Sequence, residues 1–122
     1  MMQKRILVIE DNEDNRRIVR DLLTSAGYEV IEAVTGSGGV TAAETQDPEL
    51  ILMDIPLPDL DGYAATRRIK ANPTLSPIPI IAVTSYALSG DDVKAFEAGC
   101  DAYVTKPYSP RKLLAKIREY LE

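Results

Sequence analysis

Short runs of apolar residues recur along the chain and are separated by segments of helical length. The runs cover residues 6–9, 28–34, 50–53, 78–83 and 102–104. Continuous apolar runs of this length are typical of strands buried on both faces, and their alternation with helices is typical of a parallel sheet covered by helices on both sides. The pattern therefore predicts five strand–helix pairs in an α/β fold.

The first and last helices are indicated by their apolar stripes and by their ends. Gly27 predicts the end of the first helix, because glycine readily adopts the left-handed conformation that stops a helix. Ser109 is a favourable N-cap for the last helix, and Pro110 fits its first position. The stripes expected to face inward are Ile18, Val19, Leu22, Leu23 and Ala26 in the first helix and Leu113, Leu114, Ile117 and Leu121 in the last.

The third and fourth helices are indicated by helical spacing and by residues that end helices. We expect the third helix over residues 62–71, because the Asn-Pro pair that follows disfavours further helix. We expect the fourth helix from Ser89 to Gly99, with Val93 and Phe96 facing inward.

The second helix, expected over residues 37–45, contains two adjacent glycines. Inside a helix, Gly38 and Gly39 each cost about 1 kcal/mol relative to alanine. We therefore expect this helix to be short or mobile.

The composition is that of one ordinary globular domain. The 122 residues are 45% hydrophobic and 27% charged, with a net charge of −5. A chain of this size buries enough apolar surface to fold without disulfides or structural metals. We expect a single domain over residues 1–122, with no output domain.

Composition and charge also exclude several classes of function. No apolar run approaches the roughly 20 residues of a membrane-spanning helix, and a single cysteine fits a reducing, cytoplasmic compartment. The net acidity argues against nucleic acid as the main partner. The absence of histidine removes the commonest general base, the commonest nitrogen ligand for metals and any phosphohistidine on this chain.

Polar residues follow four of the five predicted strands. They are Glu10 and Asp11 after the first strand, Asp54 after the third, Thr84 after the fourth and Lys106 after the fifth. In an open parallel sheet, functional groups gather beyond the carboxyl ends of the strands, near the point where the strand order reverses. With the order 2-1-3-4-5, the first and third strands are neighbours at that point, so the three carboxylates converge.

This set of side chains has the chemistry of an aspartyl-phosphate site. Clustered carboxylates repel one another and suit a hard divalent cation such as Mg²⁺ (or Mn²⁺). Asp54 is the candidate nucleophile for a phosphoryl group, and Lys106 and the Thr84 hydroxyl would bind the phosphoryl oxygens. Each residue taken alone also fits an ordinary loop or strand end, and it is their coincidence at four strand ends that favours a site.

The motifs at these strand ends resemble the receiver domain of bacterial two-component response regulators. The resemblance rests on residues 8–12, 52–55, Pro58, Asp61-Gly62, 82–84 and 98–107, which span the chain in order. Among these domains, the chain is most similar to single-domain receivers of the DivK and chemotaxis type. The resemblance implies a flavodoxin-like (βα)5 three-layer sandwich whose five-stranded parallel sheet has the order 2-1-3-4-5.

The resemblance also implies a role for each site residue. Asp54 would be the phosphoacceptor. Asp11, Asp54 and the backbone carbonyl of Pro56 would bind Mg²⁺ directly. Glu10 would bind it through a water molecule, and Lys106 would pair with the phosphoryl group.

A switch and a set of partners are implied in the same way. Thr84 would shift toward the phosphoryl oxygens and Tyr103 would turn inward behind it, which would change the surface formed by the fourth helix, fifth strand and fifth helix. The peptide between Lys106 and Pro107 would be cis. The phosphoryl donor would be a sensor histidine kinase or a histidine phosphotransfer protein, and a downstream protein would bind the changed surface. The domain would be a monomer or a weak, phosphorylation-linked dimer, with no direct contact to nucleic acid or membrane.

Three other functions are alternatives to this one. An Mg²⁺-dependent phosphatase with an aspartyl-phosphate intermediate would carry Asp-x-Asp after the strand, and residues 54–56 lack the second Asp. A flavodoxin-type FMN module would have a first loop rich in Ser, Thr and Gly that binds phosphate. Residues 12–15 are instead two asparagines, a glutamate and an aspartate, and the acidic pair would repel phosphate. A phosphorylation-independent interaction module stays compatible with the sequence. The leading expectation is a phosphoaccepting signalling domain that assists its own phosphorylation and autodephosphorylation and is not a conventional enzyme.

Overall fold

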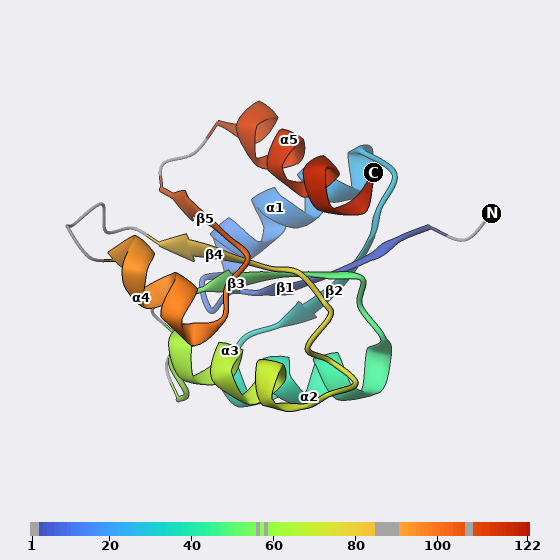
Figure 1. The fold of residues 1–122 in the computed structure, drawn as a ribbon. Helices are drawn as coiled ribbons and strands as arrows, with labels where there is room; N and C mark the ends of the chain where they lie inside the picture. The colour runs from blue at the N-terminus through green and yellow to red at the C-terminus, as the bar shows by residue number, and fades with distance from the viewer. Residues whose placement is uncertain (1–2, 56, 58, 85–90, 107–108) are drawn as a thin grey trace.

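The computed structural model describes residues 3–55, 57, 59–84, 91–106 and 109–122, in which five strands alternate with five helices (Figure 1). The strands are β1 Arg5–Ile9, β2 Glu29–Ala33, β3 Leu50–Asp54, β4 Ile80–Thr84 and β5 Ala102–Thr105. The helices are α1 Glu13–Ser25, α2 Gly36–Gln46, α3 Gly62–Ala71, α4 Asp91–Ala98 and α5 Pro110–Leu121. Within this described part of the chain, no helix is both long and apolar enough to span a membrane.

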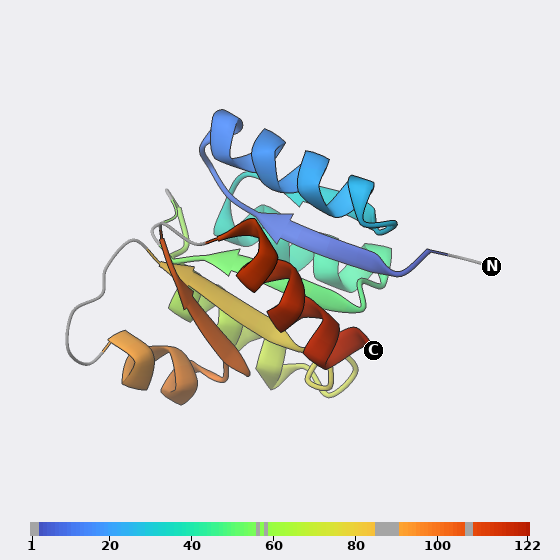
Figure 2. The same cartoon turned by 90° about the horizontal axis from the view of Figure 1, so that it is seen from above.

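The strands form one parallel sheet in the order β2-β1-β3-β4-β5. Helices α1 and α5 cover one face of the sheet, and α2, α3 and α4 lie on the other (Figure 1). Seen from above, β3 lies in the middle of the sheet, between β1 on one side and β4 and β5 on the other (Figure 2). The predicted flavodoxin-like (βα)5 sandwich is therefore confirmed, and β1 and β3 are neighbours where the strand order reverses.

Two apolar clusters, one on each face of the sheet, form the core. Alternate residues of a strand point to opposite faces, so Ile6 and Val8 pack beneath α1 and α5, whereas Leu7 and Ile9 pack beneath the other three helices. All residues of β3 and β4 are buried. This confirms the prediction that the central strands are buried on both faces.

The helix ends agree with the sequence where the structure describes them. Gly27 and Gly99 have positive φ angles of 95° and 111° and follow α1 and α4. The hydroxyl of Ser109 accepts a hydrogen bond from the backbone of Lys112 and caps α5. The start predicted for the fourth helix at Ser89 lies outside the described residues.

The predicted inward faces of α1 and α4 are wrong in part. The large apolar side chains that are exposed instead are Ile18 at 59%, Val93 at 52% and Phe96 at 52%. Helix α4 buries the small residues Ala95 and Ala98 and leaves its larger side chains Val93 and Phe96 exposed. Helix α1 is buried mainly along Val19 and Leu23, a narrower stripe than the spacing predicts.

The sequence predicts that helix α2 is short or mobile. The helix is 11 residues long and therefore not short, and its mobility stays a prediction. Two of its glycines serve close packing. A Cβ atom at Gly36 would lie 1.9 Å from the carbonyl oxygen of Leu60, and one at Gly39 would lie 2.4 Å from Cδ1 of Ile9. The packing that these glycines permit offsets their low helix propensity, because helices in proteins are stabilised mostly by tertiary contacts.

The segment between α3 and β4 is held by Lys70. Its ammonium donates hydrogen bonds to the carbonyls of Ser76 at 2.9 Å and Ile78 at 2.8 Å, and it pairs with Asp101 at 3.1 Å. The same oxygen of Asp101 accepts a hydrogen bond from the backbone of Ile80 at 2.8 Å. These contacts join the starts of β4 and β5, whose far ends carry two of the predicted site residues.

We expect Gly39→Ala to destabilise the protein although alanine is the better helix former. The added methyl group would collide with the buried side chain of Ile9, and overpacking of this kind costs about 1–3 kcal/mol. Gly38→Ala is the matched control, because Gly38 is exposed and an added Cβ would meet no core side chain, only the N-cap hydroxyl of Thr35 at 2.9 Å. Its free energy of unfolding should stay within about 1 kcal/mol of the wild-type value. Denaturant unfolding of the three proteins tests this, and equal stability of the two alanine variants would contradict it.

Candidate functional site

Three of the predicted site residues project from the same face of the sheet. Val8 and Leu52 lie in the cluster beneath α1 and α5. Glu10 and Asp54 are each two residues further along, so they face the same side at the carboxyl ends of β1 and β3. Lys106 follows β5, and its side chain reaches both carboxylates from there.

The ammonium of Lys106 lies between two buried carboxylates. Its Nζ is 3.0 Å from Oε1 of Glu10 and 3.2 Å from Oδ1 of Asp54. Because Glu10 and Asp54 are only 6% and 5% exposed, water screens these ion pairs little, and the charge-assisted hydrogen bonds are strong. Lys106 therefore ties the ends of three strands together.

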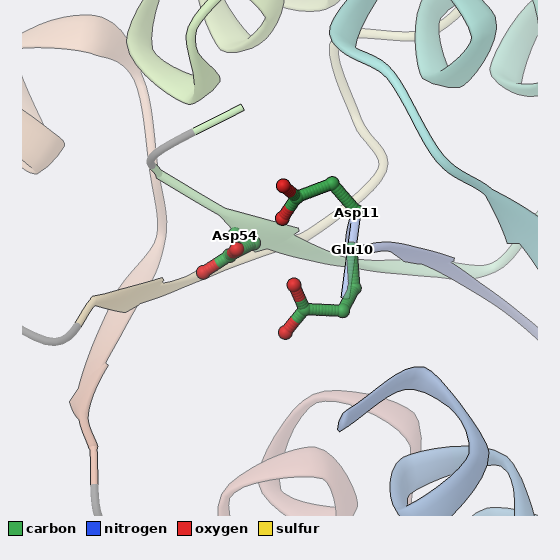
Figure 3. Close-up of side chains that lie close together, drawn as sticks. All are labelled: Glu10, Asp11 and Asp54. Atoms are coloured by element: carbon green, nitrogen blue, oxygen red, sulfur yellow. The ribbon is translucent and has the colours of Figure 1, made fainter. Parts of the chain in front are cut away.

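Asp11 completes a cluster of three carboxylates. One oxygen each of Glu10, Asp11 and Asp54 lies within 4.8 Å of the others. Figure 3 shows Glu10 and Asp11 leaving the end of β1 in opposite directions, with Asp54 beside them at the end of β3. Asp11 is exposed, so a small ion has access to the cluster from solvent.

Burial and the neighbouring carboxylate of Glu10 raise the pKa of Asp54 from its ordinary value of 3.8 to about 7. Burial is the larger cause, and the hydrogen bond and charge of Glu10 add to it, while Lys106 opposes the rise. Asp54 borders a small cavity of about 20 Å³, whose apolar lining is Val8, Ile9, Val19, Leu52, Val83 and Leu113. A divalent cation would relieve the same repulsion, so both the donor set and the electrostatics fit Mg²⁺ or Mn²⁺.

The two partners of Asp54 keep their charges. Burial acts to raise the pKa of Glu10, but the hydrogen bonds with Asp54 and Lys106 lead the contributions that bring it below 4.5. Burial acts to lower the pKa of Lys106, but the hydrogen bond to Glu10 and the charges of both carboxylates raise it above 10.5. As the pH falls through neutrality, the pair formed by Glu10 and Asp54 therefore binds one proton, and the raised pKa is that of Asp54.

Thr84 and Tyr103 lie on neighbouring strands and share the other face of the sheet. Thr84 is 1% exposed, and its carbonyl accepts a hydrogen bond from the backbone of Lys106 at 2.7 Å. Tyr103 pairs with Ala82 in the register of β4 and β5 and packs, partly buried, against the cluster beneath α2, α3 and α4. Since Thr84 is two residues beyond Ala82, it projects from the same face as Tyr103.

Two predicted features fall outside the described residues. Pro56, the predicted carbonyl ligand of the metal, is one of them. Pro107, the second residue of the predicted cis peptide with Lys106, is the other. Both features stay predictions from the sequence.

Asp59 makes contacts near the site that are not predicted from the sequence. Its carboxylate accepts hydrogen bonds from the Ser37 hydroxyl and from the backbone of Gly36 at 2.8 Å. The bond from Ser37, followed by one from the backbone of Leu60, lowers the pKa of Asp59 to about 2. These bonds fasten the loop after Asp54 to the N-terminus of α2. No local pattern signals a contact whose partners lie 22 and 23 residues apart.

Arg16 makes a second contact that was not predicted. Its Nη1 donates a hydrogen bond to the carbonyl oxygen of Glu10 at 3.1 Å, and its Nε lies 3.1 Å from Oε1 of Glu32. The helical pattern of α1 marks Arg16 as polar, but it does not indicate which strand the side chain reaches.

Comparison with known proteins finds relatives along nearly the whole chain. Residues 6–118 match the response regulator receiver domain family. The polar-differentiation response regulator DivK of Brucella ovis is 40% identical over 120 residues, and the match covers 98% of each chain.

Solved structures of receiver domains share the fold closely. The receiver domain of a sensor histidine kinase from Pseudomonas aeruginosa, which has a magnesium ion coordinated in its active site cleft, is 38% identical with a TM-score of 0.92 and 98% coverage of each chain. A CheY-like response regulator receiver domain protein from Methanospirillum hungatei is 36% identical with a TM-score of 0.91, and the match covers 98% of this chain and 94% of that one.

The raised pKa of Asp54 predicts how the stability of the metal-free protein changes with pH. Between the pKa of an unfolded aspartate and about 7, the folded protein binds more protons than the unfolded chain, so its free energy of unfolding falls as the pH rises through this range. Asp54→Asn removes the ionisable group. From about pH 5 to about pH 8, the free energy of unfolding of the wild type should therefore fall by about 2 kcal/mol more than that of Asp54→Asn.

Denaturant unfolding in the presence of a chelator measures this difference. Asp14→Asn is the control for the removal of an acidic side chain, because Asp14 is exposed at the start of α1. Parallel profiles for the wild type and Asp54→Asn would contradict the raised pKa.

Proposed function

The chain belongs to the response regulator receiver domain family, and on that premise we propose that it accepts a phosphoryl group on Asp54 from a phosphohistidine of a sensor histidine kinase or a histidine phosphotransfer protein. The observation that carries the proposal is the buried carboxylate of Asp54, paired with Lys106 at 3.2 Å and grouped with two further carboxylates. The phosphohistidine comes from a partner, because the chain contains no histidine.

In the proposed reaction, a carboxylate oxygen of Asp54 attacks phosphorus as the bond from phosphorus to the partner's imidazole nitrogen breaks. The new bond is an acyl phosphate, and the electron pair of the broken bond stays on the imidazole. Lys106, already within hydrogen-bonding distance of Asp54, neutralises negative charge on the incoming group. The chain thus promotes its own phosphorylation without turning over an external substrate as a conventional enzyme does.

A divalent cation, Mg²⁺ or Mn²⁺, completes the proposed site. Asp11 and Asp54 would bind it directly, together with the carbonyl of Pro56, and Glu10 would bind it through water. When bound, the cation would neutralise charge on the three carboxylates and on the phosphoryl oxygens. The donor set of this chain supports the assignment, and so does the magnesium ion in the Pseudomonas aeruginosa relative.

The proposed output is a change in the surface formed by α4, β5 and α5. Phosphorylation adds about −1.5 to −2 charges and three acceptor oxygens at Asp54. In the proposed switch, the Thr84 hydroxyl moves toward these oxygens to donate a hydrogen bond, and Tyr103 turns into the space that Thr84 leaves. The exposure of Val93 and Phe96 on α4 supports a protein target at this surface.

The same proposal includes the domain organisation, the cellular compartment and the oligomeric state. Residues 1–122 act as one receiver domain in the cytoplasm, where a single cysteine stays reduced. The domain works as a monomer or as a weak dimer linked to phosphorylation, and its contacts are with proteins, not with nucleic acid or membrane.

Uptake of phosphoryl from acetyl phosphate, followed by intact-protein mass, tests the proposed function. The wild type should gain one phosphoryl group when Mg²⁺ is present and none when it is chelated. Asp54→Asn should gain none, and Lys106→Ala should react at least about tenfold more slowly, because one electrostatic stabiliser of the transferring group is lost.

Asp14→Asn controls for the loss of an exposed acidic residue and should react like the wild type. Uptake that persists in Asp54→Asn would contradict the choice of phosphoacceptor. Absence of uptake in the wild type, from acetyl phosphate and from a phosphohistidine donor alike, would contradict the proposed function and favour a phosphorylation-independent interaction module.

A further inference from the structure

The side chain of Arg16 connects α1, β2 and the turn that carries Glu10 and Asp11. Its Nε pairs with Oε1 of Glu32 on β2 at 3.1 Å, and its Nη1 donates to the carbonyl oxygen of Glu10 at 3.1 Å. We propose that Arg16, oriented by Glu32, is a positioning residue that holds the Glu10–Asp11 peptide in the geometry needed to bind the divalent cation. This inference rests on the proposed function, because it assigns Arg16 to the same metal site.

The place of Arg16 in its helix supports a role in holding this turn. Arg16 is the fourth residue of α1, and a positive charge near the N-terminus of a helix is opposed by the helix dipole. Its side chain is nevertheless only 17% exposed, compared with 41% for Arg20 one turn later. Helix stability alone therefore does not account for an arginine that folds back over the start of its own helix.

Glu10 is fixed at each of its other polar groups as well. Its backbone N–H donates to the carbonyl of Ala33 at 3.0 Å. Its carboxylate accepts a hydrogen bond from the backbone of Asn12 at 3.2 Å and pairs with Lys106 at 3.0 Å. Arg16 adds the bond to the carbonyl oxygen, which belongs to the peptide that leads directly to Asp11. The orientation of that peptide sets where the carboxylate of Asp11 can lie relative to Asp54.

Glu32 orients this guanidinium and a second one. It accepts a hydrogen bond from Nε of Arg16, and both of its oxygens accept from Nη1 of Arg20, at 3.2 and 3.3 Å. The planar guanidinium of Arg16 directs two N–H groups to acceptors on different elements, which a lysine ammonium on a flexible stem cannot reproduce with the same geometry.

Removal of Arg16 should change the affinity for the cation in opposite directions, depending on whether Arg16 acts by position or by charge. Arg16 is a positive charge beside three carboxylates, so its removal should tighten cation binding if charge alone matters. If Arg16 acts by positioning, its removal should weaken cation binding. Residues that orient metal ligands typically contribute about 10- to 100-fold to metal affinity.

Arg20 provides the matched control. It lies on the same helix, carries the same charge and binds the same glutamate, and no bond to Glu10 is among its contacts in the described residues. Calorimetric titration with MgCl₂ should show Arg16→Ala weaker than the wild type by about tenfold. Arg16→Lys, which keeps the charge but loses the planar fork, should also be clearly weaker. Arg20→Ala and Arg20→Lys should stay within about twofold of the wild type.

Amide hydrogen exchange of the metal-free protein gives a second measurement that needs no bound cation. The amide of Asn12, which donates to Glu10, should exchange about fivefold faster in Arg16→Ala and Arg16→Lys than in the wild type, because local opening of the turn is easier. The two Arg20 variants should match the wild type. Thermal unfolding of all five proteins shows whether a change in exchange is local or global.

The two measurements separate this inference from the proposed function. Mg²⁺ affinity that is unchanged or tighter in both Arg16 variants, with unchanged exchange at Asn12, would overturn the role of Arg16. A wild type that binds no Mg²⁺ would contradict the proposed metal site, and the exchange at Asn12 would then decide whether Arg16 holds the turn. The expected result is that the Arg16 variants, and not the Arg20 variants, bind Mg²⁺ more weakly and exchange the Asn12 amide faster.

Discussion

The site depends on the placement of two carboxylates, Glu10 and Asp54, side by side where little water reaches them. Lys106 neutralises one of the two charges, and the other must be balanced by a proton or by a cation. That is why the pKa of Asp54 rises to about 7 while Glu10 stays ionised. Apolar side chains at these strand ends would remove the desolvation penalty, since well-packed apolar residues often replace buried ion pairs without loss of stability. The arrangement is thus understandable as a binding site and not as a means of stabilising the fold.

The parallel sheet supplies the precision that this arrangement needs. Lys106 is 96 residues from Glu10 and 52 from Asp54 along the chain, yet the three meet because β1, β3 and β5 end at the same edge. The buried, hydrogen-bonded pair of β3 and β4 fixes where each of these strands ends. Contacts outside the sheet fix the turns. Lys70 joins the starts of β4 and β5, and Asp59 fastens the loop after Asp54 to α2.

Much of this could be predicted from the sequence, because the informative patterns are local. Apolar runs, caps and glycine stops predict the strands and most helix ends, and polar residues at strand ends predict the group formed by Glu10, Asp54 and Lys106. The predictions that were wrong concern features that depend on long-range packing. Periodicity alone does not distinguish a helix that buries Ala95 from one that buries Phe96, and the penalty for Gly39 is offset by contact with Ile9 on a distant strand. The contacts of Arg16 and Asp59 cross between elements, so no local pattern indicates them.

The two faces of the sheet carry different parts of the proposed mechanism, and a backbone hydrogen bond between Lys106 and Thr84 is among the contacts that connect them. Glu10, Asp54 and Lys106 face α1 and α5, whereas Thr84 and Tyr103 face the helices on the other side. The backbone of Lys106 donates to the carbonyl of Thr84 at 2.7 Å, so the residue that carries the ammonium of the charged face is bonded directly to a residue whose side chain lies on the other face. Among its described side chains, α4 buries alanines, whereas α5 buries Leu113 and Ile117. Because apolar burial stabilises in proportion to area, displacing α4 costs less than displacing α5. The proposed response at α4 is therefore consistent with its weaker anchoring on the sheet.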